Sequence, residues 1–493
     1  MSGCAADNQL IVIIVCLTER SAANRQKFSM LELPQKIVRL AKIVREAGGR
    51  ALLVGGCVRD RFMNIAPKDW DVEVYAVEPQ QLRQILDGFG KVDAVGEAFT
   101  VYKIGQDLDV SLPRRERKTG RGHRGFVVEG DPKMSFEEAC RRRDFTINAI
   151  LLDPLDQEII DPFDGRRDIE KKLLRIVSSE TFAEDSLRVL RAAQFAARFE
   201  FEIDPETVEI CRRIDLTDLP KERIWGEFEK LLLKSNKPSI GLKWLYDLGV
   251  VEQLFPELKA LVGVPQQPEW HPEGDVDIHT LLAVDVARTL IDDLPYSKKV
   301  AVMLGALCHD FGKPETTELL DGKWRSLGHD EAGVAPTESF LDRLGIYTLD
   351  GYDARRQIVE LVKAHLRPGE FYSARENLGD GAFRRLARKV EPDLLYRVAK
   401  ADSLSRNGEW LPPEKWFTAD AMEWFIEKSR ELNVEHEPPK KILMGRHLLE
   451  LGLKPSPLIG EIERAVYEMQ LDGRVTNLGE AVKAARSLIE TAN

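Results

Sequence analysis

The sequence lacks the features that mark a membrane protein, a disulfide framework or a uniformly basic coat. Its apolar stretch at 10–17 covers eight residues, short of the roughly 20 that a membrane helix needs. No positive charge precedes that stretch, as it would in a signal peptide. Six cysteines are scattered without a CxxC pair, which argues against a zinc ribbon and a disulfide-stabilised fold. We therefore expect a reduced, cytoplasmic protein with no membrane partner.

The net charge of −11 excludes a protein whose whole surface is basic, although a local basic patch is sufficient for phosphate contacts. With 43% hydrophobic and 31% charged residues, the composition is that of an ordinary globular protein. The length of 493 residues predicts roughly three or four domains. A coherent pattern begins at Met30, so we expect residues 1–29 to be an extension ahead of the true start.

A glycine turn and two carboxylates lie near the beginning of that pattern. An apolar run ends in Gly55 and Gly56, Arg59 follows, and Asp69 and Asp71 come ten residues later. Carboxylates at positions i and i+2 of a strand point to the same face. Oxygen ligands on one face, beside backbone N–H groups that glycine leaves accessible, suit Mg²⁺ and a triphosphate. The stretch predicts a magnesium-dependent nucleotide site; the simpler interpretation is a strand, a turn and two solvated acids.

The surrounding pattern predicts a small α+β domain with a mixed sheet. Apolar periodicity places helices at 31–47 and 79–89 and short strands at 51–54, 91–93, 100–104 and 108–112. Asp109 lies on the last of these strands and would complete a carboxylate trio. Asp107 competes with Asp109 for that role, so two candidates remain for the third ligand.

Two basic segments follow these strands. The stretch 113–125 predicts a mobile basic loop that contacts RNA or phosphate, or else a solvated linker. Its candidate RNA-binding residues are Arg114, Arg115, Arg117 and Lys118. Further on, three arginines ending in Arg143 precede an apolar, β-prone run and would grip phosphates bidentately at a sheet edge. Asp144 would accept a hydrogen bond from a ribose hydroxyl.

An amphipathic helix expected over 183–198 carries residues suited to selecting a base. Glu184 and Asp185 would lie in its first turn, where the helix dipole alone is sufficient reason for acids. Asp185 also shares a face with Arg188, and Arg188 with Arg191. A carboxylate beside a guanidinium accepts from an exocyclic amine and donates to a ring acceptor, which is the pattern of cytosine and adenine. The pair predicts acceptance of CTP and ATP and rejection of GTP and UTP.

Histidine is concentrated in the middle of the chain, where five of the eight fall between His271 and His365. A lone histidine on an apolar helix is usually a packed or surface residue. Histidine and aspartate side chains that meet from several helix ends instead form a metal site. The candidates are His279, His309, Asp310, His329, His365 and Asp402.

Four ordered motifs, GGCVRD, DWD, RRDFTINA and EDSLRVLRAAQFAAR, resemble those of the class II tRNA nucleotidyltransferases, the CCA-adding enzymes. The bacterial poly(A) polymerases share the same head. The resemblance covers 52–233 and includes ERIWGE at 222–227, which is similar to the family's helix-stabilising Arg/Glu pair. It implies a nucleotidyltransferase (polymerase-β-like) head with Mg²⁺, and tRNA, ATP and CTP as partners rather than DNA.

The resemblance also assigns residues. It implies Asp69 and Asp71 as Mg²⁺ ligands, and Gly56, Arg59 and Arg143 as triphosphate or ribose contacts. It also implies Asp185, Arg188 and Arg191 as nucleotide contacts. To these we add, from the residue pattern alone, Asp109 as a catalytic carboxylate and Gly55 and Asp144 as nucleotide contacts. Gln194 departs from the pattern, because many members carry a further arginine there. The basic stretch from Arg114 matches the flexible segment of members that add the terminal A.

WHPEGDVDIHT, LCHDFGK and GHDEAG resemble the HD phosphohydrolase domain that is fused to many bacterial CCA-adding enzymes. The matching positions are His279, His309, Asp310 and Asp402. This resemblance implies a phosphatase or phosphodiesterase that uses a divalent transition metal such as Ni or Mn. The alternative is a retained fold with a weak metal site.

Together these patterns predict a series of domains after the 1–29 extension. They are a nucleotidyltransferase head (30–165), an all-α neck and body that selects the nucleotide and binds RNA (166–260), an all-α HD domain (261–437) and a helical tail that holds tRNA (438–493). The predicted activity is template-independent addition of CMP, CMP and AMP to tRNA 3′ ends. The alternatives are a poly(A) polymerase, an A-adding-only enzyme, or an HD phosphohydrolase with a non-catalytic RNA-binding head.

Overall fold

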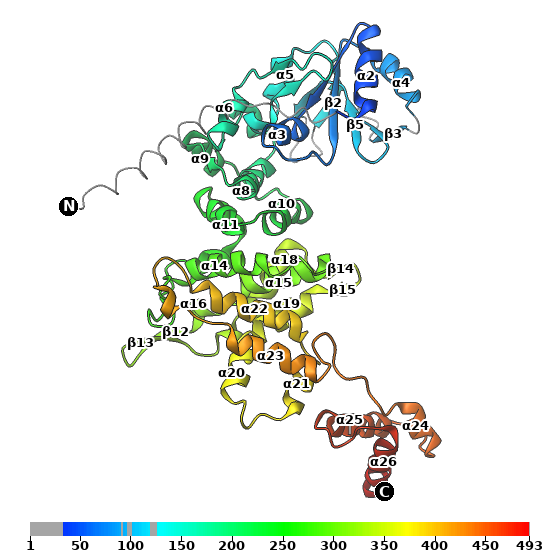
Figure 1. The fold of residues 1–493 in the computed structure, drawn as a ribbon, viewed down its shortest axis with the longest axis vertical. Helices are drawn as coiled ribbons and strands as arrows, with labels where there is room; N and C mark the ends of the chain where they lie inside the picture. The colour runs from blue at the N-terminus through cyan, green and yellow to red at the C-terminus, as the bar shows by residue number, and fades with distance from the viewer. Residues whose placement is uncertain (1–32, 90–91, 96–100, 119–125, 493) are drawn as a thin grey trace, which may run out of the picture. The chain divides into compact units, whose positions relative to one another are not determined.

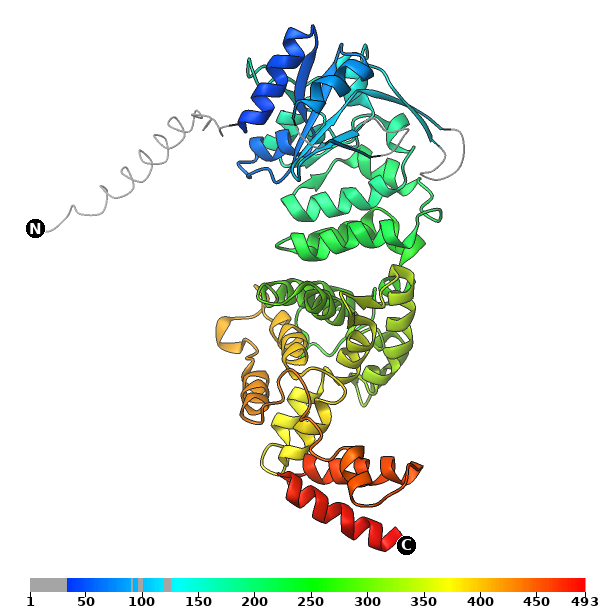
Figure 2. The same ribbon diagram turned by 90° about the vertical axis from the view of Figure 1, so that its right-hand side faces the viewer.

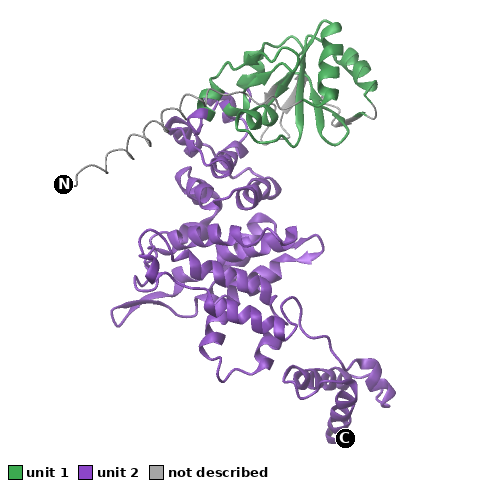
Figure 3. Cartoon of the chain, in the orientation of Figure 1, with its two compact units in different colours: residues 1–119, 126–141, 147–169 green, residues 120–125, 142–146, 170–493 purple. Residues whose placement is uncertain are grey.

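The computed structural model describes residues 33–89, 92–95, 101–118 and 126–492, and the chain divides into two compact units. The head unit holds the described residues up to 118 together with 126–141 and 147–169 (green in Figure 3). The helical unit holds 142–146 and the chain from 170 onward (purple in Figure 3). The segment 142–146 therefore belongs to the helical unit, although the chain on both sides of it belongs to the head unit.

A mixed sheet forms the centre of the head unit (Figure 1). It has seven strands in the order β3-β4-β5-β2-β1-β8-β9. Its strands are β1 (Arg50–Val54), β2 (Trp70–Tyr75), β3 (Val92–Val95), β4 (Val101–Ile104), β5 (Leu108–Ser111), β8 (Leu151–Leu152) and β9 (Ile159–Ile160). β2 and β5 pair in parallel, and the other neighbours pair antiparallel. The predicted mixed sheet and its first five strands are confirmed.

The helices of this part of the chain are α2 (Gln35–Glu46), α3 (Gly56–Phe62), α4 (Pro79–Asp87), α5 (Phe136–Arg141) and α6 (Gly165–Glu170). α2 is amphipathic because Ile37, Leu40, Ala41 and Val44 recur at helical spacing, and all four are buried. α2 packs on β1 and α4, and α3 packs on β1 and β2. The sheet and these helices share one hydrophobic core.

Two segments differ from the prediction. Residues 114–118 form a strand, β6 (Arg114–Lys118), rather than a loop, because β7 (Phe126–Gly130) supplies its backbone hydrogen-bond partners. The run after Arg143 forms a short 3₁₀ turn, η1 (Thr146–Asn148), rather than a sheet edge. The Thr146 N–H donates to the Arg175 carbonyl, and the Val177 N–H donates to the Asp144 carbonyl. The segment 175–177 thus provides hydrogen-bond partners for backbone groups that would have paired with a neighbouring strand in a sheet.

The helical unit begins with α7 (Ser179–Phe182), α8 (Leu187–Phe199), α9 (Pro205–Arg212), α10 (Lys221–Lys234), α11 (Pro238–Asp247), α12 (Val250–Leu254) and α13 (Pro256–Ala260). A short parallel pair, β10 (Leu173–Leu174) and β11 (Glu202–Ile203), accompanies them. α8 is buried on most sides and packs against α10 and α11. Gly241 on α11 permits this packing, because a Cβ there would lie 2.8 Å from the Ala193 carbonyl oxygen. α8 is therefore held firmly within its own unit.

The middle of the helical unit is built around α15 (Tyr296–Cys308), an apolar helix that contacts α14, α19 and α22 (Figure 1 and Figure 2). The helices here are α14 (Val276–Thr289), α16 (Lys313–Thr316), α17 (His329–Ala332), α18 (Val334–Leu344), α19 (Ala354–Ala364), α20 (Arg367–Ser373), α21 (Asp380–Leu386), α22 (Pro392–Ser405), η2 (Pro413–Lys415) and α23 (Asp420–Glu431). Two small hairpins, β12 (Thr317–Leu320) with β13 (Lys323–Ser326) and β14 (Thr348–Leu349) with β15 (Tyr352–Asp353), are added to them.

The end of the chain forms α24 (Gly445–Glu450), α25 (Pro457–Leu471) and α26 (Leu478–Ala492), which enclose a small core of their own. The architecture is thus a mixed-sheet α+β head followed by helices, as predicted. Among the described residues, no helix combines the length and apolar character needed to span a bilayer.

Candidate functional sites

The predicted carboxylates lie at the β2–β5 pair. Asp71 on β2 is the direct partner of Asp109 on β5 in the parallel register. Side chains of directly paired residues point to the same face of a sheet, so the two carboxylates share a face. Asp69 lies two residues before Asp71, immediately ahead of the first residue of β2. Asp69 and Asp71 are exposed and Asp109 is half-buried, so all three are accessible to a cation with a bound triphosphate.

The two candidates for the third carboxylate have different surroundings. Asp107 precedes β5, its carboxylate forms an ion pair with Lys36, and its carbonyl oxygen accepts from the Trp70 N–H at 2.8 Å. Asp109 lies on the strand itself, 3.6 Å from the Lys103 ammonium. The geometry therefore favours Asp109 as the partner of Asp71.

The glycine turn leads into α3. Gly55 has a φ of 68°, in the left-handed region that favours glycine, and it precedes the first residue of α3, Gly56. Arg59 is buried; its Nε donates to Asp60 Oδ1 at 2.8 Å and its Nη1 donates to Asn148 Oδ1 at 2.8 Å. Asn148 is a residue that the sequence did not single out. These bonds fix the orientation of the Arg59 guanidinium. Arg59 therefore supports the glycine turn, and it is also a candidate phosphate contact.

Asp144 and Arg191 form a strong ion pair within the helical unit. Arg191 Nε and Nη2 both donate to Asp144 Oδ2, at 2.9 and 2.6 Å. Glu227 Oε1, on α10, lies 3.7 Å from Arg191 Nη1. Burial opposes the charge on the guanidinium, but Asp144 and Glu227 raise the pKa of Arg191 above its usual value. The guanidinium is therefore charged and fixed in orientation.

Asp185 and Arg188 do not pair with each other in the way that a shared helix face suggested. α8 begins at Leu187, so Asp185 lies ahead of the helix and its Oδ1 accepts from the Leu187 N–H at 3.2 Å. Asp185 Oδ2 accepts from Arg223 at 2.9 Å. Arg188 donates to the Thr181 and Arg142 carbonyl oxygens, at 2.7 Å each. Each member of the predicted pair is held by its own partners at the start of α8.

The ERIWGE segment supplies one partner of Asp185 and one neighbour of Arg191. Arg223 holds Asp185, and Glu227 lies near Arg191 and accepts from Lys230 at 2.9 Å. Gln194, at the departure from the family pattern, is almost fully buried. Arg143 is half-buried. Sequence reasoning had given ERIWGE only a helix-stabilising role, and no spacing rule would have connected it to α8.

Of the four predicted RNA-binding residues, Arg114 is half-buried and Arg115 is exposed on β6. Arg115 Nε donates to Asp131 Oδ2 at 2.8 Å. The backbone of Arg117 and Lys118 belongs to β6, but their side chains and residues 119–125 lie outside the described part of the chain.

A second cluster forms where helices of the helical unit converge. His279 Nε2 lies 3.2 Å from His309 Nε2 and 3.1 Å from Asp402 Oδ1. His309 Nε2 lies 3.2 Å from Asp310 Oδ2. All four residues are among the six predicted candidates, and they come from α14, the end of α15 and α22. The prediction that His and Asp side chains from several helix ends meet at one spot is correct.

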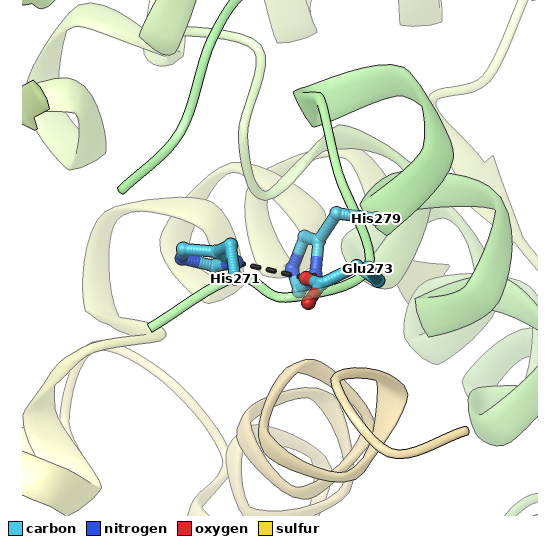
Figure 4. A group of neighbouring side chains, drawn as sticks. All are labelled: His271, Glu273 and His279. Carbon is cyan, nitrogen blue, oxygen red and sulfur yellow. Dashed lines mark hydrogen bonds and ion pairs between the residues drawn. The ribbon is translucent and has the colours of Figure 1, made fainter. Parts of the chain in front are cut away.

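Two further histidines join this cluster. His329 Nε2 lies 3.4 Å from Asp310 Oδ1 and 3.2 Å from His365 Nε2. A buried carboxylate, that of Glu273, lies beside the cluster. It accepts hydrogen bonds from the Nδ1 atoms of His271 and His279, at 2.9 and 2.7 Å (Figure 4). Sequence reasoning missed Glu273, although it lies in the WHPEGD motif.

Protonation in this cluster follows from burial and neighbouring charge. Burial, with His329 and His309 nearby, lowers the pKa of His365 to about 3. Burial opposes ionisation of Asp310, but His309 and Lys313 hold its pKa well below the usual range. Asp310 Oδ2 is buried and forms an ion pair with Lys313 Nζ at 2.7 Å. Imidazole nitrogens grouped with buried carboxylates fit a divalent transition metal.

Three family models match successive parts of the chain. The Poly A polymerase head domain matches residues 51–175. The probable RNA and SrmB-binding site of polymerase A matches 200–261, and the HD domain matches 276–407.

Curated relatives and solved structures agree with this order. The multifunctional CCA protein of Stenotrophomonas maltophilia (strain K279a) is 42% identical over 373 residues, which cover 72% of this chain and 86% of the relative. That of Methylococcus capsulatus is 37% identical over 377 residues, covering 73% and 83%. The fold resembles the Bacillus stearothermophilus CCA-adding enzyme in complex with CTP, with a TM-score of 0.61, 21% identity and 93% and 97% coverage. By these relatives, the chain belongs to the CCA-adding tRNA nucleotidyltransferase family, in the group that carries an HD domain.

Proposed function

We propose that this protein adds CMP, CMP and AMP in sequence to the 3′ end of tRNA, taking them from CTP and ATP without a template. The observation that carries this proposal is the placement of Asp71 beside Asp109 on parallel strands, with Asp69 two residues away. Such a carboxylate trio suits two-metal phosphoryl chemistry. The family relationship supplies the substrate class.

The head residues would hold Mg²⁺, which neutralises the triphosphate and lowers the pKa of the attacking hydroxyl when it is bound. Asp69, Asp71 and Asp109 would be its ligands. The turn at Gly55 and Gly56 leaves backbone N–H groups accessible to phosphate oxygens. Arg59 would support that turn, because Asp60 and Asn148 already hold its guanidinium.

The start of α8 would select the base. Asp185 is fixed by Arg223 and the Leu187 N–H, and Arg188 is fixed by two carbonyl oxygens. A fixed acceptor near a fixed donor matches the amine and ring nitrogen of cytosine and of adenine, and it opposes guanine and uracil. Asp144 would fix the orientation of the Arg191 guanidinium, which would then contact the nucleotide. The Asp144 carboxylate would lie near the ribose of that nucleotide. Arg143, Arg114 and the other β6 arginines would contact phosphates.

One assay tests this activity and its closest alternatives. The purified protein is given tRNA ending before, within or after CC, with each nucleotide separately. Our proposal expects C addition from CTP, then one A from ATP, and no reaction with GTP or UTP. A long A tract would instead identify a poly(A) polymerase, and addition only to tRNA already ending in CC would identify an A-adding enzyme. An Asp69→Ala/Asp71→Ala variant that extends tRNA at the normal rate would disprove the role of the head.

We also propose that the HD domain is a metal-dependent phosphatase or phosphodiesterase. His279, His309, Asp310 and Asp402 would hold a divalent transition metal such as Ni or Mn, and this metal supplies the activated nucleophile when it is bound. Hydrolysis of a cyclic nucleotide phosphate, lost in His309→Ala but retained in Asp71→Asn, would support this function. If none of these metals supports hydrolysis, the HD domain has only a structural role.

Cys211 and Cys308 are buried thiols, which accords with a reducing compartment, and we place the activity in the cytoplasm.

A further inference from the structure

The HD domain has a pocket beside its histidine cluster. Two tryptophans, two histidines, a lysine, two glutamines and a serine line this pocket. Two of the lining side chains also contact Asp310: Lys313 Nζ lies 2.7 Å from Asp310 Oδ2, and His329 Nε2 lies 3.4 Å from Asp310 Oδ1. A molecule bound in the pocket would therefore lie next to groups of the proposed hydrolytic site.

The two tryptophans give the pocket an aromatic surface. Trp270 lies in the loop ahead of α14 and is 55% exposed, and Trp324 lies on β13 and is half-buried. An indole ring is large and flat, and it stacks favourably on another planar π-system. A planar ligand that covered the two indoles would also remove apolar surface from water.

Hydrogen bonds join the two segments that carry these tryptophans. Gln267 Oε1 accepts from the Trp324 N–H at 3.2 Å, and the Gln267 carbonyl oxygen accepts from the Trp270 N–H at 2.9 Å. Glu269, next to Trp270, forms an ion pair of 3.3 Å with Lys323, next to Trp324. The loop and the β12–β13 hairpin are thus held together before any ligand binds, which lowers the entropic cost of binding.

The chemistry of the lining indicates the class of ligand. Among the described residues that line the pocket there is no aspartate or glutamate, whereas Lys313 supplies an ammonium group and His271 and His329 supply imidazoles. An ammonium group in a pocket without lining carboxylates favours an anion such as phosphate. The indoles favour a planar ring, and a nucleoside phosphate combines such a ring with a phosphate.

The amide side chains of the pocket are already engaged within the protein. Gln266 Oε1 accepts from Lys313 Nζ at 2.7 Å, and Gln266 Nε2 donates to the Gly274 carbonyl oxygen at 3.0 Å. Gln267 Oε1 accepts from the Trp324 N–H. Stacking, by contrast, tolerates any base, because every base has a π-face. The pocket should therefore accept all four bases, unlike the start of α8.

We propose that this pocket binds a nucleoside phosphate, with the base stacked on Trp270 and Trp324 and the phosphate toward Lys313. The inference rests on the proposed HD function for the reaction, but it concerns the two tryptophans. They are positioning residues that distinguish nucleotides from other phosphate esters. The ligand is a free nucleotide or the nucleotide at the end of an RNA.

Binding tests the proposal without an activity assay. The full-length chain carries Asp69→Asn/Asp71→Asn, which weakens nucleotide binding by the head, and it is titrated calorimetrically with GMP, UMP and ribose 5-phosphate. GMP and UMP carry the bases that the head is expected to reject, and ribose 5-phosphate has the same ester without a base. We expect GMP to bind at least about tenfold more tightly than ribose 5-phosphate, with UMP between them.

Variants on that background assign the preference to the tryptophans. Trp270→Ala/Trp324→Ala should weaken GMP binding at least about tenfold and ribose 5-phosphate binding much less, because only stacking is lost. Trp270→Phe should bind GMP more tightly than Trp270→Ala, since an aromatic ring remains. Trp416, which is 50% exposed and outside the described lining of this pocket, provides the control: Trp416→Ala should bind GMP like the parent. Trp270→Ala alone provides the test if the double variant does not fold.

Equal affinities for GMP and ribose 5-phosphate in the parent, or unchanged GMP binding in Trp270→Ala/Trp324→Ala, would overturn the proposal. An RNA trinucleotide with a 3′-phosphate that displaces GMP would identify an RNA end as the ligand, and one that fails to displace it would identify a free nucleotide.

Failure of the HD function is a separate result. Base-dependent binding without any hydrolysis would remove the enzymatic activity and leave the nucleotide pocket. Hydrolysis of ribose 5-phosphate as fast as that of GMP, in the parent and in Trp270→Ala/Trp324→Ala alike, would keep the activity and overturn the role of the tryptophans.

Discussion

Arg191 on α8 donates two hydrogen bonds to a single oxygen of Asp144, which lies 47 residues earlier in the chain. We predict that Asp144→Asn lowers the free energy of unfolding by about 1–3 kcal/mol, because it leaves a mostly buried guanidinium without its charged acceptor. The same change should raise KM for both CTP and ATP. Urea unfolding and steady-state kinetics measure the two effects. Asp156→Asn, at an exposed pair with Arg45, is the control and should leave the free energy of unfolding nearly unchanged.

The third carboxylate can be identified with a matched pair of variants. Asp109→Asn should reduce kcat by about 100-fold or more, because it removes an oxygen ligand beside Asp71. Asp107→Asn removes only an ion pair with Lys36 and should change kcat by a few fold. Single-turnover incorporation of CMP measures both. Equal losses, or a larger loss for Asp107→Asn, would contradict the assignment.

Arg223 should act on nucleotide choice through Asp185. In Arg223→Ala the Asp185 carboxylate loses the partner that orients it, so we expect the preference for CTP and ATP over UTP and GTP to fall about tenfold. Arg223→Lys should recover part of the preference, since a cation returns to the same place. The ratio of kcat/KM values for CTP and UTP is the readout, with exposed Arg213→Ala as the control. An unchanged ratio with a lower melting temperature would mean that Arg223 has only a structural role.

Two cysteines should be protected from alkylation in a pH-dependent manner. Burial raises the pKa of Cys211 to about 12 and raises that of Cys308 well above the ordinary value. The reactive thiolate loses about a factor of ten for each unit by which the pKa exceeds the pH. At pH 8 iodoacetamide should therefore modify Cys211 at least about 100-fold more slowly than a free cysteine, and faster as the pH rises. Peptide mapping by mass spectrometry measures this, and rapid labelling before unfolding would contradict the burial.

Local sequence pattern was sufficient for much of the head. The strands around Gly55 and Asp71, the helix of Ile37 and Val44, and the carboxylate positions all follow from short-range periodicity, which a single segment carries by itself. The family assignment followed from the same short motifs, and the relatives confirm it. The residue roles and domain boundaries stay predictions.

Contacts between side chains that are distant in the chain could not be predicted from the sequence. The pairing of Asp144 with Arg191 and the hydrogen bond from Arg223 to Asp185 depend on how α8 and α10 pack. β6 escaped prediction because its charged residues have low strand propensity and its partner β7 satisfies the backbone. The ion pair between Lys313 and Asp310 was not predicted either, although both residues lie in the LCHDFGK motif.

The five residues 142–146 limit how this protein can be cut or recombined. They include Phe145, fully buried with Phe182 and Phe195, and Asp144, the acceptor for Arg191. A fragment that ended at 169 would keep these residues but lose Phe182 and Phe195, which pack on Phe145, and Arg191, which donates to Asp144. The helical unit expressed from 170 onward would lack its own insert. Neither unit is therefore a contiguous module, and an exchange of heads between related enzymes would have to carry over this insert and a matching α8 together.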